Sequence, residues 1–291
     1  MHNTLLILAA GISSRMKKST ADHAVSPEDA AQANTRSKGL IGVGEGGRPL
    51  LDYLLYNAQK SGYRNIIVII NEKNELIKQF YGAKSRNNQF HGLNISYAIQ
   101  YIPAGREKPL GTADAVLQAM EQFPWLQQEE FTVCNSDNLY SQKALRLLRE
   151  TNHPNAFISY DRSGLEFSAE RIAKFAVTRV DAANYLIDVV EKPALEEMER
   201  YTDENGVVRV SMNIFKFNGK MIYNYLRNCP LTPGRNEKEL ASALRNLIAD
   251  HPASVLGIPL KEHVPDLTEK NDIKKMRRYL AEHYPKLDWG E

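Results

Sequence analysis

Short apolar runs alternate with amphipathic segments through the first half of the chain. Four of these runs are typical of strands buried in a sheet: Leu5–Ala9, Ile66–Ile70, Ile95–Ile99 and Phe131–Cys134. Between them apolar residues recur at helical spacing, most clearly at Leu50, Leu51, Leu54, Leu55 and Ala58, with Pro49 suited to the first turn. This β–α alternation predicts an α/β fold whose sheet is mostly parallel, with helices on both faces.

The second half predicts shorter connections, so we expect some antiparallel pairing and therefore a mixed sheet. Its strand candidates are Ala156–Tyr160, Ala173–Arg179, Tyr185–Val190, Val207–Phe217 and Ser254–Ile258. Helices are predicted around Leu240–Ile248 and over Asp272–His283. The stretch Ser19–Ser37, rich in Ala, Ser, Thr, Asp and Asn, is expected to be a mobile surface loop that closes over a ligand.

Composition indicates a soluble globular protein, with 43% hydrophobic and 25% charged residues among 291. No repeat or linker separates the chain, so a single domain over residues 1–291 is expected, with halves 1–150 and 151–291. The net charge of +2 argues against a nucleic-acid partner. The first apolar run is too short for a membrane span and lacks a basic leader. Cys134 and Cys229 form no C-x-x-C pattern, which favours a reducing, cytoplasmic location.

The first strand candidate ends in a loop of small residues, Ala10-Gly11-Ile12-Ser13-Ser14, followed by Arg15. Backbone N–H groups in such a loop can face an anion, and Arg15 adds a permanent positive charge. The loop matches neither the G-x-G-x-x-G dinucleotide fingerprint nor the G-K-[ST] ending of a P-loop. Taken alone, it is equally an ordinary strand–helix turn. Lys38 adds weight only if its segment folds back toward Arg15.

Polar residues also follow several other predicted strands. In a parallel sheet, ligands bind beyond the carboxyl ends of the strands, and a carboxylate there can hold Mg²⁺. Asp137 in Asn135-Ser136-Asp137-Asn138 fits this description, although an Asx-turn would explain it equally. Asp266 is a candidate second ligand or a plain helix cap. Gly111-Thr112 could allow the backbone to approach a planar base closely, or it could simply be the capped start of a helix. Glu191-Lys192-Pro193 places an acid and a base at a strand end, which could be part of a binding site or a surface pair before a helix.

Taken in order, these pieces resemble the sugar-1-phosphate nucleotidyltransferases, the group of glucose-1-phosphate thymidylyl- and uridylyltransferases. The matching pieces are Leu8-Ala9-Ala10-Gly11, Ser14-Arg15-Met16, Lys38, Gly111-Thr112-Ala113, Ser136-Asp137, Glu191-Lys192-Pro193 and Asp266. The resemblance covers nearly the whole chain. It implies a three-layer α/β/α sandwich of the nucleotide-diphospho-sugar transferase type. It also implies that a nucleoside triphosphate and a sugar 1-phosphate are joined with release of pyrophosphate.

The resemblance implies a role for each matching residue. Arg15, Lys38 and Lys192 would serve catalysis by holding phosphates, and Asp137 and Asp266 would hold Mg²⁺. The nucleotide would be bound by Ala10, Gly11, Gln100, Gly111 and Thr112, and the sugar by Glu191 and Asn213. The chain departs from the family pattern at Ser13 and Asn213, where Gly is usual, and its stretch from Arg15 to Lys38 is longer.

The chemistry agrees with these roles, because a phosphate oxygen is already a nucleophile and needs no general base. Catalysis requires positive charge around the α-phosphate and alignment of two anions that repel each other. UTP or dTTP is the favoured triphosphate. A phosphocholine-type cytidylyltransferase and a catalytically inactive, nucleotide-sugar-binding regulator stay open as alternatives, and so does assembly into a homo-oligomer.

Overall fold

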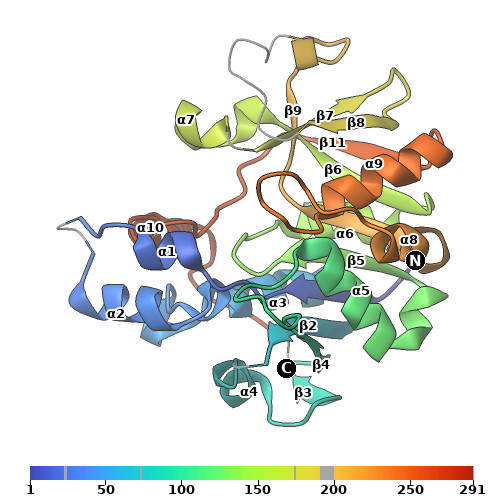
Figure 1. Cartoon of the computed structure of the whole chain (residues 1–291). Helices are drawn as coiled ribbons and strands as arrows, with labels where there is room; N and C mark the ends of the chain where they lie inside the picture. The colour runs from blue at the N-terminus through green and yellow to red at the C-terminus, as the bar shows by residue number, and fades with distance from the viewer. Residues whose placement is uncertain (23–24, 73, 174, 191–199, 291) are drawn as a thin grey trace. The chain divides into compact units, whose positions relative to one another are not determined.

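The computed structural model describes residues 1–22, 25–72, 74–173, 175–190 and 200–290 (Figure 1). The chain divides into two compact units that are interleaved in sequence. The first unit contains Asn3–Pro109, Asn135–Leu145 and Pro265–Glu291, and the second contains Met1–His2, Leu110–Cys134 and Arg146–Val264. Each unit has its own sheet strands and helices, and each is described by itself.

The strands of the first unit form a mainly parallel sheet. The element bounds are β1 (Thr4–Leu8), β2 (Asn65–Asn71), β3 (Asn88–Phe90) and β4 (Leu93–Gln100). β2 lies between β1 and β4 and is parallel to both, whereas β3 pairs antiparallel with β4 at the edge. Leu5, Leu6 and Ile7 have no exposed surface. A central strand with both faces covered must be apolar along its whole length, as the sequence predicts.

In the described part of the first unit, helices and 3₁₀ turns accompany the strands. They are α1 (Ser14–Lys18), α2 (Pro27–Thr35), α3 (Leu50–Lys60), α4 (Leu76–Tyr81) and α10 (Asp272–His283), with turns at Lys38–Leu40 and Glu45–Gly47. Helix α6 (Gln142–Glu150) begins in the first unit and ends in the second. The apolar stripe predicted for α3 is confirmed, because its leucines and Ala58 are fully buried.

The prediction of a mobile loop over Ser19–Ser37 is wrong, because residues 27–35 form helix α2. The hydroxyl of Ser26 accepts a hydrogen bond from the Asp29 amide at 3.1 Å, and Pro27 occupies the first turn together with Glu28 and Asp29. A capping serine, an N-terminal proline and early carboxylates are strong signals for a helix start. The polar composition of the stretch obscured these signals.

The second unit has a largely antiparallel sheet. Its strands are β5 (Glu130–Asn135), β6 (Asn155–Asp161), β7 (Ala176–Val180), β8 (Leu186–Val190), β9 (Arg209–Ser211), β10 (Ile214–Asn218) and β11 (Val255–Leu260). The strand order is β5-β10-β6-β9-β7-β8, and β11 pairs with β6 in parallel. Together the two units give the predicted α/β fold with a mixed sheet.

The helices of the second unit are α5 (Thr112–Gln122), α7 (Ala169–Ile172), α8 (Gly219–Arg227) and α9 (Leu240–Asp250), with 3₁₀ turns at Pro124–Gln127 and Arg162–Gly164. Helices α5, α8 and α9 pack against one another. One prediction is wrong here, and one helix was missed. The predicted strand Val207–Phe217 is two strands, because the backbone turns at Asn213 with φ 57°. Helix α8 has no counterpart among the predicted elements, although Asn218 caps it through the Met221 amide.

Each unit carries one of the two tryptophans. Trp289, in the first unit, is 9% exposed and stacks on the His91 ring with centroids 4.2 Å apart. Its carbonyl accepts a hydrogen bond from Gln59 at 2.9 Å. Trp125, in the second unit, is 38% exposed. Among the described residues, no helix has the length and apolarity needed to cross a membrane.

Candidate active site

The chain leaves β1 through the small-residue loop that the sequence singles out. The Ala9 amide donates to the Ile69 carbonyl at 2.8 Å, and the Ala10 carbonyl accepts from the Asn71 side chain at 3.3 Å. These bonds hold the loop at the carboxyl ends of β1 and β2. Ala10 is buried and Gly11 is exposed. The loop therefore lies where ligands of parallel sheets bind.

Arg15 stands in the short helix α1 that follows the loop, and its side chain is exposed. The turn into α1 passes through Ser13 in the left-handed region, with φ 57°. The far end of α1 is fixed by Lys270, which donates to the carbonyls of Lys17 at 3.0 Å and Ser19 at 2.6 Å. Arg15 thus sits on a helix whose last turn is capped by a buried cation.

Lys38 and Asp137 form an ion pair with Nζ and Oδ2 2.7 Å apart. Both side chains are largely buried, at 12% and 22% exposure. The neighbouring Gly39 explains the approach, because a Cβ there would lie 3.0 Å from the Ser136 carbonyl oxygen. The Ser136 amide donates to Leu8 at 3.1 Å, so Asp137 lies beside the end of β1. Lys38 is therefore held beside the end of β1, the strand that leads into the small-residue loop.

Asp266 lies on a segment that is hydrogen-bonded to the Asp137 loop. Asn138 and Asp266 form an antiparallel bridge, and the Leu267 amide donates to the Asp137 carbonyl at 2.9 Å. Asp266 Oδ2 accepts from the Thr268 hydroxyl at 2.8 Å. The two predicted metal ligands are thus carried by adjacent backbone segments at the same edge of the first unit.

Gln100 completes the set in the first unit. It ends β4, is 3% exposed and pairs in register with Asn71, the residue that holds Ala10. The structure therefore places seven of the predicted site residues in the first unit. They are Ala10, Gly11, Arg15, Lys38, Gln100, Asp137 and Asp266.

Gly111, Thr112 and Asn213 belong to the second unit. Gly111 has φ 120°, and a Cβ there would lie 2.3 Å from the Lys238 carbonyl oxygen. Packing against residues 238–240 is thus sufficient to require glycine. Thr112 makes no side-chain cap for α5, contrary to the sequence prediction; its hydroxyl accepts from the Leu240 amide at 3.1 Å. No local pattern indicates this joint, because it links residues more than a hundred positions apart.

Asn213 lies between β9 and β10 and is exposed. Its positive φ of 57° is a conformation that asparagine tolerates better than most residues, which accounts for its presence where the family usually has glycine. Glu191, predicted to bind the sugar, and Lys192, predicted to hold the sugar phosphate, lie outside the described residues.

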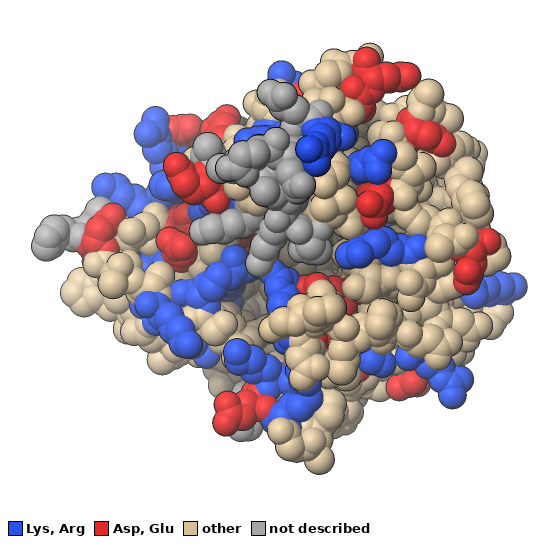
Figure 2. Space-filling view, turned by 45° about the horizontal axis from the view of Figure 1, so that its top comes forward, with Lys and Arg blue, Asp and Glu red and all other residues tan. Residues whose placement is uncertain are grey.

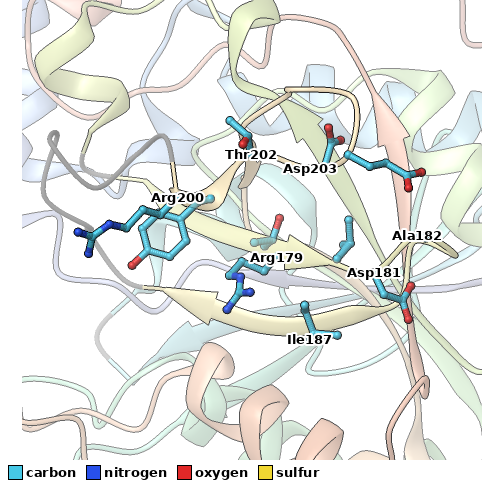
Figure 3. A pocket seen from close by; sticks show the side chains of 11 residues that line it. Arg179, Asp181, Ala182, Ile187, Arg200, Thr202 and Asp203 are labelled. Carbon is cyan, nitrogen blue, oxygen red and sulfur yellow. The ribbon is translucent and has the colours of Figure 1, made fainter.

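A cavity of about 140 Å³ lies on the β7–β8 hairpin of the second unit, lined by residues 178–182, Ile187 and residues 200–204 (Figure 3). It contains none of the predicted site residues. Two of its carboxylates, Asp181 and Asp203, already accept hydrogen bonds from turn amides. The residues that line this cavity therefore do not overlap with the predicted site.

The donor chemistry of the first unit suits a hard cation. Asp137 and Asp266 offer carboxylate oxygens on paired backbone segments, and Mg²⁺ typically takes one or two carboxylates with phosphate oxygens and waters. Within the described ranges, no group of three or more acidic, His or Cys side chains could hold a metal. The face in Figure 2 carries both basic and acidic side chains, so its charge is mixed.

Comparison with known proteins agrees with this architecture. The sequence model described as "Nucleotidyl transferase" matches residues 33–259. Bifunctional protein GlmU of Methanococcus vannielii is 26% identical over 87% of this chain and 52% of its own length. Glucose-1-phosphate adenylyltransferase of Pectobacterium carotovorum is 25% identical over 81% of the chain and 52% of its own length. The chain thus spans about half the length of these curated relatives.

The fold is also that of a solved UDP-glucose pyrophosphorylase complexed with UDP-glucose, at a TM-score of 0.70 and 15% identity, covering 97% of this chain and 99% of that one. The architecture is therefore of the nucleotide-diphospho-sugar transferase type. The chain belongs to the nucleotidyl transferase family, and the resemblance to sugar-1-phosphate nucleotidyltransferases is confirmed.

Proposed function

We propose that this chain joins a nucleoside triphosphate to a sugar 1-phosphate, giving a nucleotide sugar and pyrophosphate. The observation that carries the proposal is the convergence of Lys38, Asp137 and the Asp266 segment beside the small-residue loop of β1. A cation, two carboxylates and a backbone loop at strand ends are the parts that polyphosphate binding requires.

In this proposal an oxygen of the sugar phosphate attacks the α-phosphorus, and the bond to the β-phosphate bridging oxygen breaks. Pyrophosphate leaves with the electron pair. Arg15 and Lys38 bind the phosphates and offset their mutual repulsion, and Lys192 does so for the sugar phosphate. Asp137 and Asp266 would hold Mg²⁺, which supplies further positive charge at the α-phosphate. Ala10, Gly11, Gln100, Gly111 and Thr112 bind the nucleotide, and Glu191 and Asn213 bind the sugar.

The Lys38–Asp137 ion pair has a consequence for this proposal. The Lys38 ammonium neutralises the carboxylate that would hold the cation. A bound triphosphate would give Lys38 a further anionic partner, and Asp137 would then be available as a ligand for Mg²⁺. The ion pair thus keeps the Lys38 ammonium and the Asp137 carboxylate close to the positions proposed for them in catalysis. Pairing also lowers the electrostatic cost of burying the two charges.

UTP or dTTP is proposed as the triphosphate, and a cytoplasmic setting is proposed for the reaction. ATP is the competing choice, because three of the curated relatives are glucose-1-phosphate adenylyltransferases. The deciding measurement is pyrophosphate release over a matrix of nucleoside triphosphates and sugar 1-phosphates, with phosphocholine as an added acceptor. Turnover with CTP and phosphocholine alone would favour a cytidylyltransferase. Ligand-induced thermal stabilisation without any turnover would favour the inactive regulator.

Asp137→Ala tests the metal role directly. We expect turnover to fall by about a thousandfold or more, because an essential charge partner of the reacting phosphates is lost, while the variant stays folded by circular dichroism. The control is Glu121→Ala, which removes an exposed carboxylate from α5 and should retain full activity. Wild-type Mg²⁺-dependent turnover in the Asp137 variant would contradict the assignment.

A further inference from the structure

Helix α2 lies in the sequence between the two cationic residues of the first unit's candidate site. It follows Arg15 and ends at Thr35, three residues before Lys38. Its side chains are hydrogen-bonded to the backbone segment that carries Lys38, directly or through Arg277, so its placement bears on that lysine.

The first such contact is a bidentate ion pair between α2 and α10. Asp29 is 4% exposed, and its two carboxylate oxygens accept from the Arg277 guanidinium at 2.6 and 2.7 Å. A buried carboxylate is unfavourable unless it is paired, and the planar fork of arginine fits it in one orientation. The pair therefore fixes α2 on α10.

The second contact joins this pair to the backbone after Lys38. The same guanidinium donates to the Gly42 carbonyl at 3.1 Å, and the Gln32 side chain accepts from the Gly42 amide at 2.9 Å. Both backbone polar groups of Gly42 are thus held by α2 and α10. A Cβ at Gly42 would lie 2.7 Å from the Gly47 carbonyl oxygen, so the contact is close on the other side as well.

The segment 38–42 is consequently fixed at two points. Gly39 rests on Ser136 at one end, and Gly42 is held by Arg277 and Gln32 at the other. Lys38 directly precedes the first of these points and reaches Asp137 from the start of the short turn Lys38–Leu40. A lysine side chain has four rotatable bonds and loses much conformational entropy when it is ordered. A rigid backbone lowers the number of positions its ammonium can sample.

We propose that Arg277, Asp29 and Gln32 are positioning residues that set the Lys38 ammonium on the phosphates of the bound triphosphate. This inference rests on the proposed function, since it assigns Lys38 a phosphate-binding role. Helix α2 is then part of the catalytic apparatus, acting through Lys38 without touching the substrate.

The test is a double-mutant cycle on kcat/KM for the triphosphate. Arg277→Met should lower kcat/KM about tenfold by misplacing Lys38, with the KM for the sugar 1-phosphate changed less than about twofold. In a Lys38→Met background the same substitution should have almost no further effect, because the group it positions is absent. Arg277→Lys should restore part of the loss. The control is Arg278→Met, one position along α10, whose side chain is 84% exposed.

The outcomes separate this inference from the proposed function. If Lys38→Met changes neither turnover nor triphosphate affinity, measured by calorimetry, the role of Lys38 itself fails. If Lys38→Met is damaging but Arg277→Met is harmless, only the positioning role fails. Equal effects of Arg277→Met in both backgrounds would show a general loss of stability and would overturn the inference. Hydrogen exchange of residues 38–42 should be faster in Arg277→Met and unchanged in Arg278→Met.

Discussion

At the scale of single residues, two positions carry side chains where the family usually has glycine. Ser13 and Asn213 both adopt φ 57°. Asparagine tolerates this region because its side chain can bond locally, whereas serine has less compensation. The sequence indicates that these two residues depart from the family pattern, but it does not indicate their backbone conformation. The φ angle depends on how each loop is held by residues distant in sequence, as Asn71 holds the loop after β1.

Ser13→Gly should stabilise the protein. A left-handed residue with a Cβ costs about 1–2 kcal/mol, and glycine's extra chain entropy returns part of the gain. We expect an increase of up to about 1 kcal/mol in the free energy of unfolding, measured with urea. Ser14→Gly, in the first turn of α1, is the matched control and should give no gain. A loss in the Ser13 variant would show that the hydroxyl is needed.

His2 predicts a pH dependence of stability. Burial, followed by the positive charges of Lys216 and the N-terminal amine, lowers the pKa of His2 to about 3. Its Nε2 lies 2.8 Å from the Thr132 hydroxyl. Between pH 6.5 and 3 the unfolded chain binds a proton that the folded chain does not, so stability falls as the pH falls through this range.

We therefore expect His2→Gln to reduce the loss of unfolding free energy between pH 7 and pH 5 by about 2 kcal/mol. Urea titrations at the two pH values measure it. His251→Gln, which replaces an exposed histidine of the same unit, should leave the pH dependence as it is in the wild type. Identical pH profiles for His2→Gln and wild type would exclude the predicted contribution.

At the scale of elements, hydrophobic periodicity predicted the principal strands and the helices α3, α9 and α10, because each buries a regular stripe or run. It failed where polar signals decide the element. Helix α2 depends on Ser26 and Pro27, and α8 on Asn218. The hydrogen bonds of Arg277 to Asp29 and to the Gly42 carbonyl join residues far apart in sequence, so no local pattern could have predicted them.

The joint between Gly111 and Lys238 gives a prediction at this scale. Gly111→Ala adds a Cβ 2.3 Å from the Lys238 carbonyl at φ 120°, so both strain and a backbone clash are expected. We expect a loss of at least about 2 kcal/mol in unfolding free energy. Gly92→Ala separates the two causes, since its φ is 75° with nothing within 4 Å of the added atom. Equal losses of unfolding free energy in the two variants would mean that the backbone around Gly111 and Lys238 moves enough to relieve the clash, so that backbone strain alone accounts for the loss.

At the scale of the whole molecule, the sequence predicted the family and the α/β class from motifs in the right order. The structure adds that seven of the predicted residues share one unit. The roles of all the predicted site residues in catalysis and ligand binding stay predictions, in the first unit as well as in the second. Their order along the chain indicated a family, whereas their geometry around a substrate depends on folding that a motif does not encode.

The proposed chemistry predicts how overall activity depends on pH. The nucleophile is a phosphate monoester, whose second pKa is about 6, and the dianion is the stronger nucleophile. We expect kcat/KM for the sugar 1-phosphate to rise about tenfold per pH unit below about 6 and to level off above it. A sugar phosphonate with a higher pKa should shift the rise upward. The same profile for both acceptors would indicate titration of a protein group.

The placement of one indole in each unit provides an optical label for each half of the molecule. Trp289, stacked on His91, should emit at shorter wavelength than the partly hydrated Trp125. In Trp125→Phe the remaining fluorescence reports melting of the first unit alone, and in Trp289→Phe that of the second. Coincident curves from the two variants would reveal cooperative denaturation, whereas separated midpoints would rank the halves by their resistance to heat.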